Sequence, residues 1–452
     1  MESRTARRVG LTSVMVAVAS LLGAVAARAQ DAVPEISSGD TAWILASAAL
    51  VMLMTAPGLA LFYGGLVSQR NMLSTLMHSF FLLCLISVQW VIFGYSLSFA
   101  PGGLVGGLDF AFFRGVGQEG APLAATVPHI AFAMFQGMFA VITPALITGA
   151  FAERMKFSVF VVFSLLWATV VYDPLCHWVW GGGWLGAMGT LDFAGGTVVH
   201  ISSGVSALVA AIMIGRRLGY PRRRFLPHSL TLTLVGGSLL WFGWFGFNGG
   251  SALASGGLAA HAFVTTHTCA ATTGLAWALI EWWHRKKPTV LGAVTGAVAG
   301  LVAITPAAGF VTVPAAMAIG LGCAVVCYLG VNTLKPRLGY DDSLDVFGVH
   351  GLGGTWGALA TGLFATTSVN AAGADGLFYG NPGQLWPQLV GVVAGWGLAI
   401  VGTVVILGGI RLFTSLRVTE EEEVTGLDLS LHGESAYSTL GSGVGTEGIR
   451  MD

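Results

Sequence analysis

Residues 192–200 read DFAGGTVVH, and residues 342–350 read DSLDVFGVH. In both stretches a histidine stands eight residues after an aspartate. A glycine follows each histidine four residues on, at Gly204 and Gly354. The surrounding residues are small or apolar, which places each imidazole inside a membrane-spanning helix. A matched pair of this kind indicates that the chain contains two related halves.

The composition predicts a membrane protein. Of the 452 residues, 54% are hydrophobic and only 10% are charged, whereas about a quarter of an average soluble protein is charged. We expect a lipid bilayer as the solvent and no nucleic acid as a partner. The five cysteines show no metal or redox spacing and are interpreted as buried small residues: Cys84, Cys176, Cys269, Cys323 and Cys327.

The first thirty residues resemble a secretory signal. Basic residues precede an apolar run from about Val9 to Ala26, and Ala27-Arg28-Ala29 resembles a cleavage site. We therefore predict a cleaved signal peptide at 1–29, with an uncleaved first helix as the alternative. The transmembrane domain is predicted to occupy 30–411 and a cytoplasmic tail 412–452.

Apolar stretches long enough to cross a bilayer core, about 20 residues each, recur along the transmembrane domain. They predict an all-α polytopic fold with eleven spans, near 41–66, 74–99, 127–150, 157–178, 195–215, 229–250, 258–283, 289–306, 311–334, 345–366 and 385–411.

Basic residues orient these spans. Alternate connections carry nearly all of the Lys and Arg residues, and the other connections carry only Arg114. By the positive-inside rule the basic connections are cytoplasmic. The mature N-terminus is then outside and the C-terminus is cytoplasmic. The tail contains the acidic run 420–423, which by itself favours a solvated appendage over a docking element.

A second match supports the two related halves. Phe62-Tyr63-Gly64-Gly65 in the first span corresponds to Phe247-Asn248-Gly249-Gly250 in the sixth, as the His200 span corresponds to the His350 span. Five helices per half is an odd number, so the halves form an inverted repeat of helices 1–5 and 6–10, with a peripheral eleventh helix. Sites in such folds lie near the midplane, where the halves meet.

Ionisable groups in membrane spans are costly and indicate function. Two facing neutral imidazoles, His200 and His350, can share a proton and form a hydrogen-bonding rail. They could instead form half of a metal site, but metals normally need three or four ligands, and we expect no metal and no cofactor. No nucleophile–base arrangement predicts an enzyme. Asp192 and Asp342 each precede a helix and are interpreted as caps.

Aromatic residues are the next signal. Phe135 and Phe139 lie four residues apart on one helix face, with Gln136 between them, and further aromatic and hydroxyl residues follow at Trp180, Trp244, Phe247 and Ser251. Near an outer mouth, aromatic faces and a serine hydroxyl can hold a small cation through cation–π contact and a hydrogen bond.

Together these motifs closely resemble the Amt/Mep/Rh ammonium transporter family, and specifically its bacterial Amt branch. The resemblance is carried by long stretches from the first helix to the tail: residues 192–200, residues 241–251 (WFGWFGFNGGS), residues 341–350, Gly426-Leu427-Asp428 and His432-Gly433-Glu434.

The resemblance implies a homotrimer with one narrow pore per subunit in a bacterial inner membrane. It implies an external ammonium-recruitment site at Trp180, Ser251 and Phe135, lined also by Phe139 and shaped by Asp192. Within the pore it implies a gate of Phe135 stacked on Phe247, then Trp244, then the twin histidines His200 and His350. It also implies docking of a PII-type signal protein on the cytoplasmic side.

Desolvation favours deprotonation as the transport mechanism. Burying bare ammonium costs tens of kcal/mol in a low-dielectric limit, whereas removing its proton at pH 7 costs about 3–5 kcal/mol. The expected function is recruitment and deprotonation of ammonium, followed by conduction of ammonia past the histidines, with methylammonium as an analogue and with net charge transfer. The alternatives are an ammonium sensor that signals through its tail and an Rh-like channel for a neutral gas.

Overall fold

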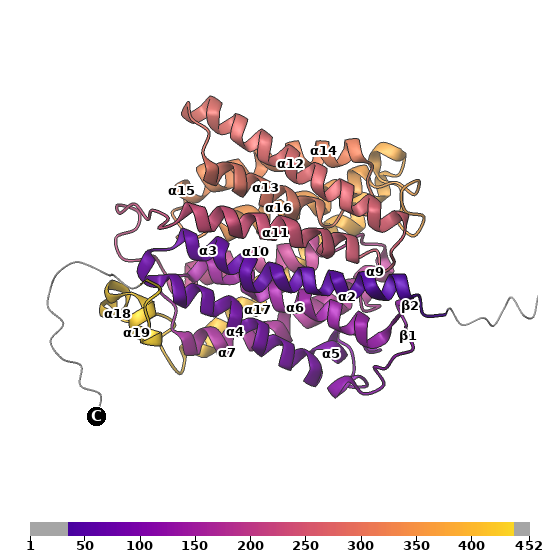
Figure 1. The fold of residues 1–452 in the computed structure, drawn as a ribbon, viewed down its shortest axis with the longest axis horizontal. Helices are drawn as coiled ribbons and strands as arrows, with labels where there is room; N and C mark the ends of the chain where they lie inside the picture. Colours follow the sequence, from indigo (N-terminus) through magenta and orange to yellow (C-terminus); the bar gives the residue numbers. More distant parts are fainter. Residues whose placement is uncertain (1–34, 438–452) are drawn as a thin grey trace, which may run out of the picture.

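Long helices dominate residues 35–437, the part of the chain that the computed structural model describes. Figure 1 shows them running side by side along a common axis. The expected signal peptide, 1–29, lies outside the described residues. We call the end of the bundle that carries α18 and α19 the tail end, and the end that carries β1 and β2 the mouth end.

Most long helices are composites in which α-helical stretches continue through a π-helical turn. The α-helices are α2 (Ser38–Leu53), α3 (Ala60–Leu66), α4 (Met72–Gln89), α5 (Tyr95–Phe99), α6 (His129–Phe151), α7 (Phe157–Trp167), α8 (Asp173–Val179), α9 (Trp184–Met188), α10 (Ser202–Ile214), α11 (Leu230–Gly250), α12 (Gly257–Arg285), α13 (Val290–Ile304), α14 (Val313–Leu329), α15 (Lys335–Leu338), α16 (Leu352–Phe364), α17 (Leu385–Arg411), α18 (Glu420–Thr425) and α19 (Leu427–His432).

Shorter elements join or interrupt these helices. The π-helical turns are η1 (Met54–Leu59), η3 (Trp90–Gly94), η5 (Ala168–Tyr172), η6 (Gly196–Ile201), η7 (Gly330–Leu334) and η8 (Phe347–Gly351). The short 3-10 helices are η2 (Gln69–Asn71), η4 (Ala111–Phe113), η9 (Leu377–Tyr379) and η10 (Pro382–Gln384). At the mouth end β1 (Gly120–Ala121) pairs antiparallel with β2 (Ala124–Pro128).

The predicted all-α polytopic fold is confirmed. Eight helical segments among the described residues are long and apolar enough to cross a membrane: Ser38–Leu66, Gln69–Phe99, His129–Phe151, Phe157–Met188, Gly196–Ile214, Leu230–Gly250, Val313–Leu338 and Pro382–Arg411. The other three predicted spans coincide with α12, with α13 and with η8 followed by α16. The helices are therefore consistent with the predicted count of eleven.

The two histidine-bearing helices cross at glycines. A Cβ on Gly204 would lie 2.0 Å from the backbone nitrogen of Gly351, and a Cβ on Gly354 would lie 2.9 Å from the carbonyl oxygen of Gly196. These two glycines are the matched positions four residues after each histidine. Because they lack side chains, η6 and α10 can approach η8 and α16 closely enough for their backbones to touch.

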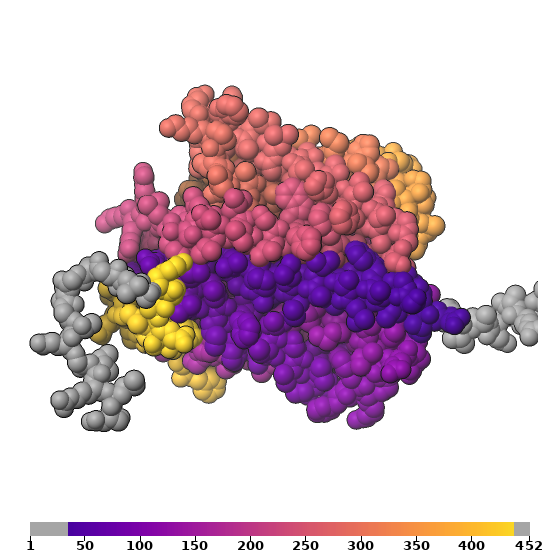
Figure 2. Space-filling view, in the orientation of Figure 1, coloured from indigo at the N-terminus to yellow at the C-terminus, as the bar shows by residue number. Residues whose placement is uncertain are grey.

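The described part of the tail, residues 412–437, is docked on the bundle, which corrects the interpretation of the tail as a solvated appendage. Figure 2 shows the α18–α19 segment, in yellow, lying against the indigo N-terminal helices at the tail end. The Asp428 carboxylate accepts hydrogen bonds from the backbone nitrogens of Leu73 (3.0 Å) and Ser74 (2.8 Å). Charge composition alone missed this contact because Asp428 is bound by backbone amides rather than by a basic side chain.

Candidate functional site

His200 and His350 meet in the interior of the bundle. Their Nδ1 atoms are 3.2 Å apart, and the side chains are 1% and 5% exposed. One imidazole must therefore donate a proton to the other, which fixes the tautomers of both while the pair is neutral. The expectation that the repeat brings the two histidines together agrees with this geometry.

Both histidines lie on π-helical turns that begin behind an aspartate. The Asp192 carboxylate accepts four backbone N–H groups, from Gly195, Gly196, Thr197 and Val198, at 2.6–3.2 Å. Asp342 accepts from the Phe347 nitrogen at 2.8 Å. The capping role indicated by the sequence is thus present in both halves. Such π-helical turns are rare and are frequent at functional sites.

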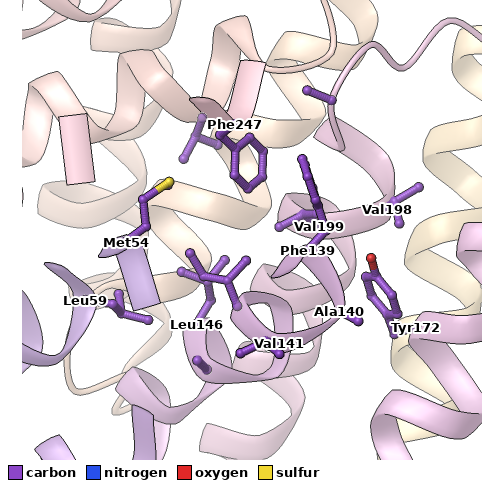
Figure 3. Packing of buried hydrophobic residues seen from close by; sticks show 14 of the residues in the cluster. Met54, Leu59, Phe139, Ala140, Val141, Leu146, Tyr172, Val198, Val199 and Phe247 are labelled. Atoms are coloured by element: carbon purple, nitrogen blue, oxygen red, sulfur yellow. The ribbon is translucent and has the colours of Figure 1, made fainter. Parts of the chain in front are cut away.

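The histidines line a narrow apolar lumen. Its volume is about 10 Å³, which is at most one water molecule. The His200 ring stacks on Trp244, with centroids 5.4 Å apart and planes 25° apart. The remaining lining is apolar: Met54, Leu59, Phe62, Ile142, Leu146, Val199, Leu240, Phe247 and Val298. Figure 3 shows several of these side chains gathered around the space between Met54 and Phe247.

A wider cavity of about 320 Å³ lies toward the mouth end. Four of the predicted site residues line it, namely Phe139, Trp180, Asp192 and Ser251. The Trp180 indole donates to the Asp192 carbonyl oxygen at 2.9 Å, and the Ser251 hydroxyl donates to the Phe247 carbonyl oxygen at 2.8 Å. Because its proton is used in this way, the Ser251 oxygen presents its lone pairs as an acceptor.

The expected stacking of Phe135 on Phe247 is wrong. The ring that faces Phe247 belongs to Phe139, with centroids 4.3 Å apart and planes 42° apart, and Figure 3 shows these two rings side by side. Phe135 packs edge-on against Phe139 and lies within contact distance of the Gly250 position. The two phenylalanines share one face of α6 but, being four residues apart, are separated by about 6 Å along its axis. That step takes Phe135 out of the outer cavity lining.

Sequence reasoning missed several residues of the outer cavity. Phe132 and Gln136 line the outer cavity together with Phe139. The three residues have the spacing of one helix face, so the periodicity of α6 could have indicated the first two. The other members come from distant elements: Phe99, Leu123, Val179, Phe193, Leu253 and Phe310. Only the packed fold brings these segments together.

A third cavity, of about 570 Å³, opens at the tail end. His350, Phe62 and Val298 line both this cavity and the narrow lumen, so the two spaces share a wall. The lining also carries charged side chains: Arg217, Arg223, Glu281, Arg285, Lys335 and Asp345. The lumen therefore lies between an aromatic cavity at the mouth end and a charged cavity at the tail end.

A buried ion cluster supports the wall of the tail-end cavity. The Arg217 guanidinium contacts the carboxylates of Glu153 and Asp341, both at 2.8 Å. Burial opposes ionisation of each carboxyl, but the Arg217 charge and local hydrogen bonds outweigh it and hold the pKa of each below its usual value. Arg154, fully buried, donates to the carbonyl oxygens of Ala150 and Gly215 and to the Ser343 hydroxyl.

The fold and this arrangement of cavities define a class of protein: a polytopic membrane protein whose interior holds a narrow apolar lumen between two wider cavities. Within residues 35–437 no group of three or more His, Cys, Asp or Glu side chains could hold a metal ion. The polar side chains that line the lumen and the outer cavity include the two imidazoles, the Ser251 hydroxyl, the Gln136 amide and the Asp192 carboxylate, which serves as a helix cap.

Residues 42–437 match the model of the Ammonium Transporter Family, and the chain belongs to that family. It is 57% identical over 400 residues to the ammonium transporter of Bacillus subtilis, covering 88% of this chain and 98% of that one. It is also similar to the crystal structure of Candida albicans Mep2, with a TM-score of 0.80, 38% identity and coverage of 86% and 88%. The solved structure of a sensor Amt protein matches with a TM-score of 0.81 and 30% identity, covering 87% of this chain and 98% of that one.

Proposed function

We propose that the chain recruits ammonium at the mouth end, removes its proton there, and conducts ammonia past His200 and His350 to the tail-end cavity. The observation that carries the proposal is the paired imidazoles in a lumen of about 10 Å³, walled by apolar side chains and lying between two larger cavities. A hydrated cation does not fit such a space, whereas a neutral ammonia molecule does.

The outer cavity supplies the contacts that a small cation needs. Trp180 and Phe139 present aromatic rings 5.9 Å apart at 85°, and the Ser251 oxygen accepts a hydrogen bond. Cation–π contacts of this kind are worth about 0.5–2 kcal/mol. Asp192 shapes this site by holding η6 through its four N–H bonds, and its lone pairs are largely occupied by them. We propose a recruitment site of Phe139, Trp180 and Ser251, with Phe139 and Phe247 as the barrier beneath it.

The balance of energies favours deprotonation at this barrier. Moving a charged ammonium ion into the lumen forfeits hydration worth tens of kcal/mol in the low-dielectric limit, while giving up its proton at pH 7 costs about 3–5 kcal/mol. The paired histidines then offer hydrogen-bonding groups to ammonia in an otherwise apolar path. The proton crosses separately, which makes transport electrogenic.

The distribution of basic residues supports an orientation in which the mouth end faces outward and the tail end faces the cytoplasm. In this orientation the charged cavity and the docked tail are available to a PII-type signal protein. We also propose assembly as a homotrimer in a bacterial inner membrane.

Uptake of methylammonium into proteoliposomes, with and without a membrane potential, tests the proposal. We expect uptake that is saturable and is accelerated by an inside-negative potential. An uptake rate that does not depend on the membrane potential would support a channel for a neutral gas. No uptake at all would refute transport.

A sensor function is the second candidate, favoured by the tail docked on the bundle and by the likeness of the chain to the sensor Amt protein. A variant that no longer transports but still alters the signalling state of a cell in response to ammonium would favour the sensor. A wild-type pore that conducts without any partner would count against it.

A further inference from the structure

The first turn of a membrane helix is capped by the tail. The N-cap residue of α4, Asn71, makes no capping bond with its own side chain, and its side-chain oxygen instead accepts the Leu427 backbone nitrogen at 2.7 Å. The free N–H groups of Leu73 and Ser74 are satisfied by Asp428 of α19. Capping stabilises a helix N-terminus by satisfying its free N–H groups, so the start of α4 depends on residues more than 350 positions away.

Buried polar atoms without partners gather beside this cap. Among the described residues they include the Ser74 hydroxyl, both ring nitrogens of His78, and Nε2 of His432. His78 lies one helical turn after Ser74 on the same face of α4 and is 2% exposed. His432 lies one turn after Asp428 on α19. Two imidazoles thus lie at the seam between the tail and the membrane helix, and neither ring has a partner for its buried nitrogens.

A row of aromatic rings connects the two histidines. The His432 ring is edge-on to Phe157 at 5.2 Å, Phe157 is 5.4 Å from Phe160, and Phe160 is 4.4 Å from His78. A neutral imidazole packs well in such surroundings, whereas an imidazolium there loses its hydration.

We propose that this seam is a proton-operated latch, in which protonation of His432 and His78 detaches α19 from the first turn of α4. The geometry supplies both parts of the latch. Asp428 holds the tail through two backbone bonds, and the apolar wall beside it accepts the histidines only while they are neutral.

The direction of the pH effect follows from the groups that face His432. Burial lowers the pKa of His432, while the charges of Asp428 and Glu434 oppose that lowering. The docked state therefore disfavours the protonated ring. Docking is strongest above the free imidazole value of about 6.5 and weakens as the pH falls from that value toward the lower pKa of the docked ring.

Asp428 acts with the opposite sign. Burial raises its pKa, opposed by the N–H groups of Ser74 and Leu73 and by the charge of His432, so the docked carboxyl retains its proton more readily than a free one. Acidification through the pKa of Asp428 would strengthen docking. The contributions of His432 and Asp428 to the pH dependence of docking can be separated, because a neutral substitution at position 432 removes only the contribution of the histidine.

Release of α19 would also affect the tail-end cavity, because α18, which directly precedes α19, contacts the loop that lines this cavity. Glu423 accepts the Leu218 backbone nitrogen at 2.7 Å and pairs with Arg417. Leu218 follows Arg217, which lines the cavity and anchors the buried ion cluster. The latch thus holds the loop that forms one wall of the cavity.

Hydrogen exchange of the Leu73 and Ser74 amides in the full-length protein tests the latch independently of transport. After correction for intrinsic exchange rates, we expect the wild type to lose at least tenfold of its protection between pH 7.5 and pH 5.5. The variant His432→Asn should keep most of its protection at both pH values, and His78→Gln should show an intermediate loss.

The matched control is His228→Gln. His228 also contacts the tail, but both ring nitrogens have partners, the Val67 carbonyl oxygen at 2.9 Å and the Tyr437 hydroxyl at 3.1 Å, so this variant should retain the wild-type pH response. Asp428→Ala should remove the protection at both pH values. The proposal is overturned if the wild type is equally protected at both pH values, if His432→Asn loses as much protection as the wild type, or if Asp428→Ala stays protected.

Discussion

The Nδ1 atoms of His200 and His350 lie 3.2 Å apart at the crossing of two π-helical turns. Each ring thereby constrains the other, because the shared proton allows only one donor at a time. Replacing His200 by Ala removes the partner of His350 and widens the lumen. We expect ammonium-evoked current on supported membranes to fall at least tenfold, with reduced selectivity over potassium. His267→Ala, an exposed imidazole on α12, is the control and should conduct normally. Wild-type current and selectivity in His200→Ala would refute the role of the pair.

Phe139 and Phe135 should respond differently to truncation. Both rings are buried, at 1% and 0% exposure, so each alanine variant should lower the unfolding free energy by about 3–5 kcal/mol. Phe139 lines the outer cavity and faces Phe247, so Phe139→Ala should also raise the KM for methylammonium several-fold, whereas Phe135→Ala, beside Gly250, should leave the KM of the folded protein unchanged. Uptake kinetics and thermal unfolding of both variants make the comparison. If Phe135→Ala raised the KM and Phe139→Ala did not, Phe135 would belong to the recruitment site.

The glycines at the helix crossing should tolerate no side chain. Gly204→Ala would place a methyl group 2.0 Å from the Gly351 nitrogen, and because that neighbour is backbone, the helices must separate. We expect little folded protein by size-exclusion chromatography. Gly408→Ala, where nothing lies within 4 Å of the new Cβ, should fold normally and gain up to about 1 kcal/mol of helix propensity. Equal yields of the two variants would count against the close crossing.

The ion cluster around Arg217 should make the fold acid-labile. The pKa values of Glu153 and Asp341 are held below those of free carboxyls, so both stabilise the fold above about pH 4.5. That stability is lost as the pH falls through their lowered values. Thermal unfolding in detergent should show a flat midpoint from pH 7 to 5 and a steep fall below pH 4.

Removing one partner of the cluster should act at neutral pH as well. Glu153→Gln leaves part of the Arg217 charge buried without compensation, which costs about 3–5 kcal/mol in comparable pairs. The surface variant Glu421→Gln should leave the midpoint unchanged. A Glu153→Gln midpoint equal to that of the wild type at pH 7 would show that the cluster contributes nothing.

The helical bundle could be predicted because each span is a separate signal: about 20 apolar residues leave few alternatives. The pairing of His200 with His350 could also be inferred, since the repeat specifies the symmetry that relates them. The π-helical turns that contain these histidines could not be predicted. The extra residue in each turn is stabilised by tertiary packing and by the caps at Asp192 and Asp342 rather than by local propensity.

Two errors in the sequence interpretation have physical causes. Phe135 and Phe139 are equivalent on a helical face, and the depth of each along the pore depends on how α6 is placed along its axis, which periodicity does not specify. The docking of the tail depends on backbone N–H groups at the start of α4, which every helix has and which composition cannot reveal.

The narrow lumen would also limit the rate of the proposed transport. In the proposed function, a space of about 10 Å³ between the two wider cavities holds one small molecule at a time, so solutes would cross in single file. Faster transport would require a wider lumen, and a wider lumen would admit hydrated ions. In the proposed function, the same small volume would therefore limit turnover and exclude hydrated cations.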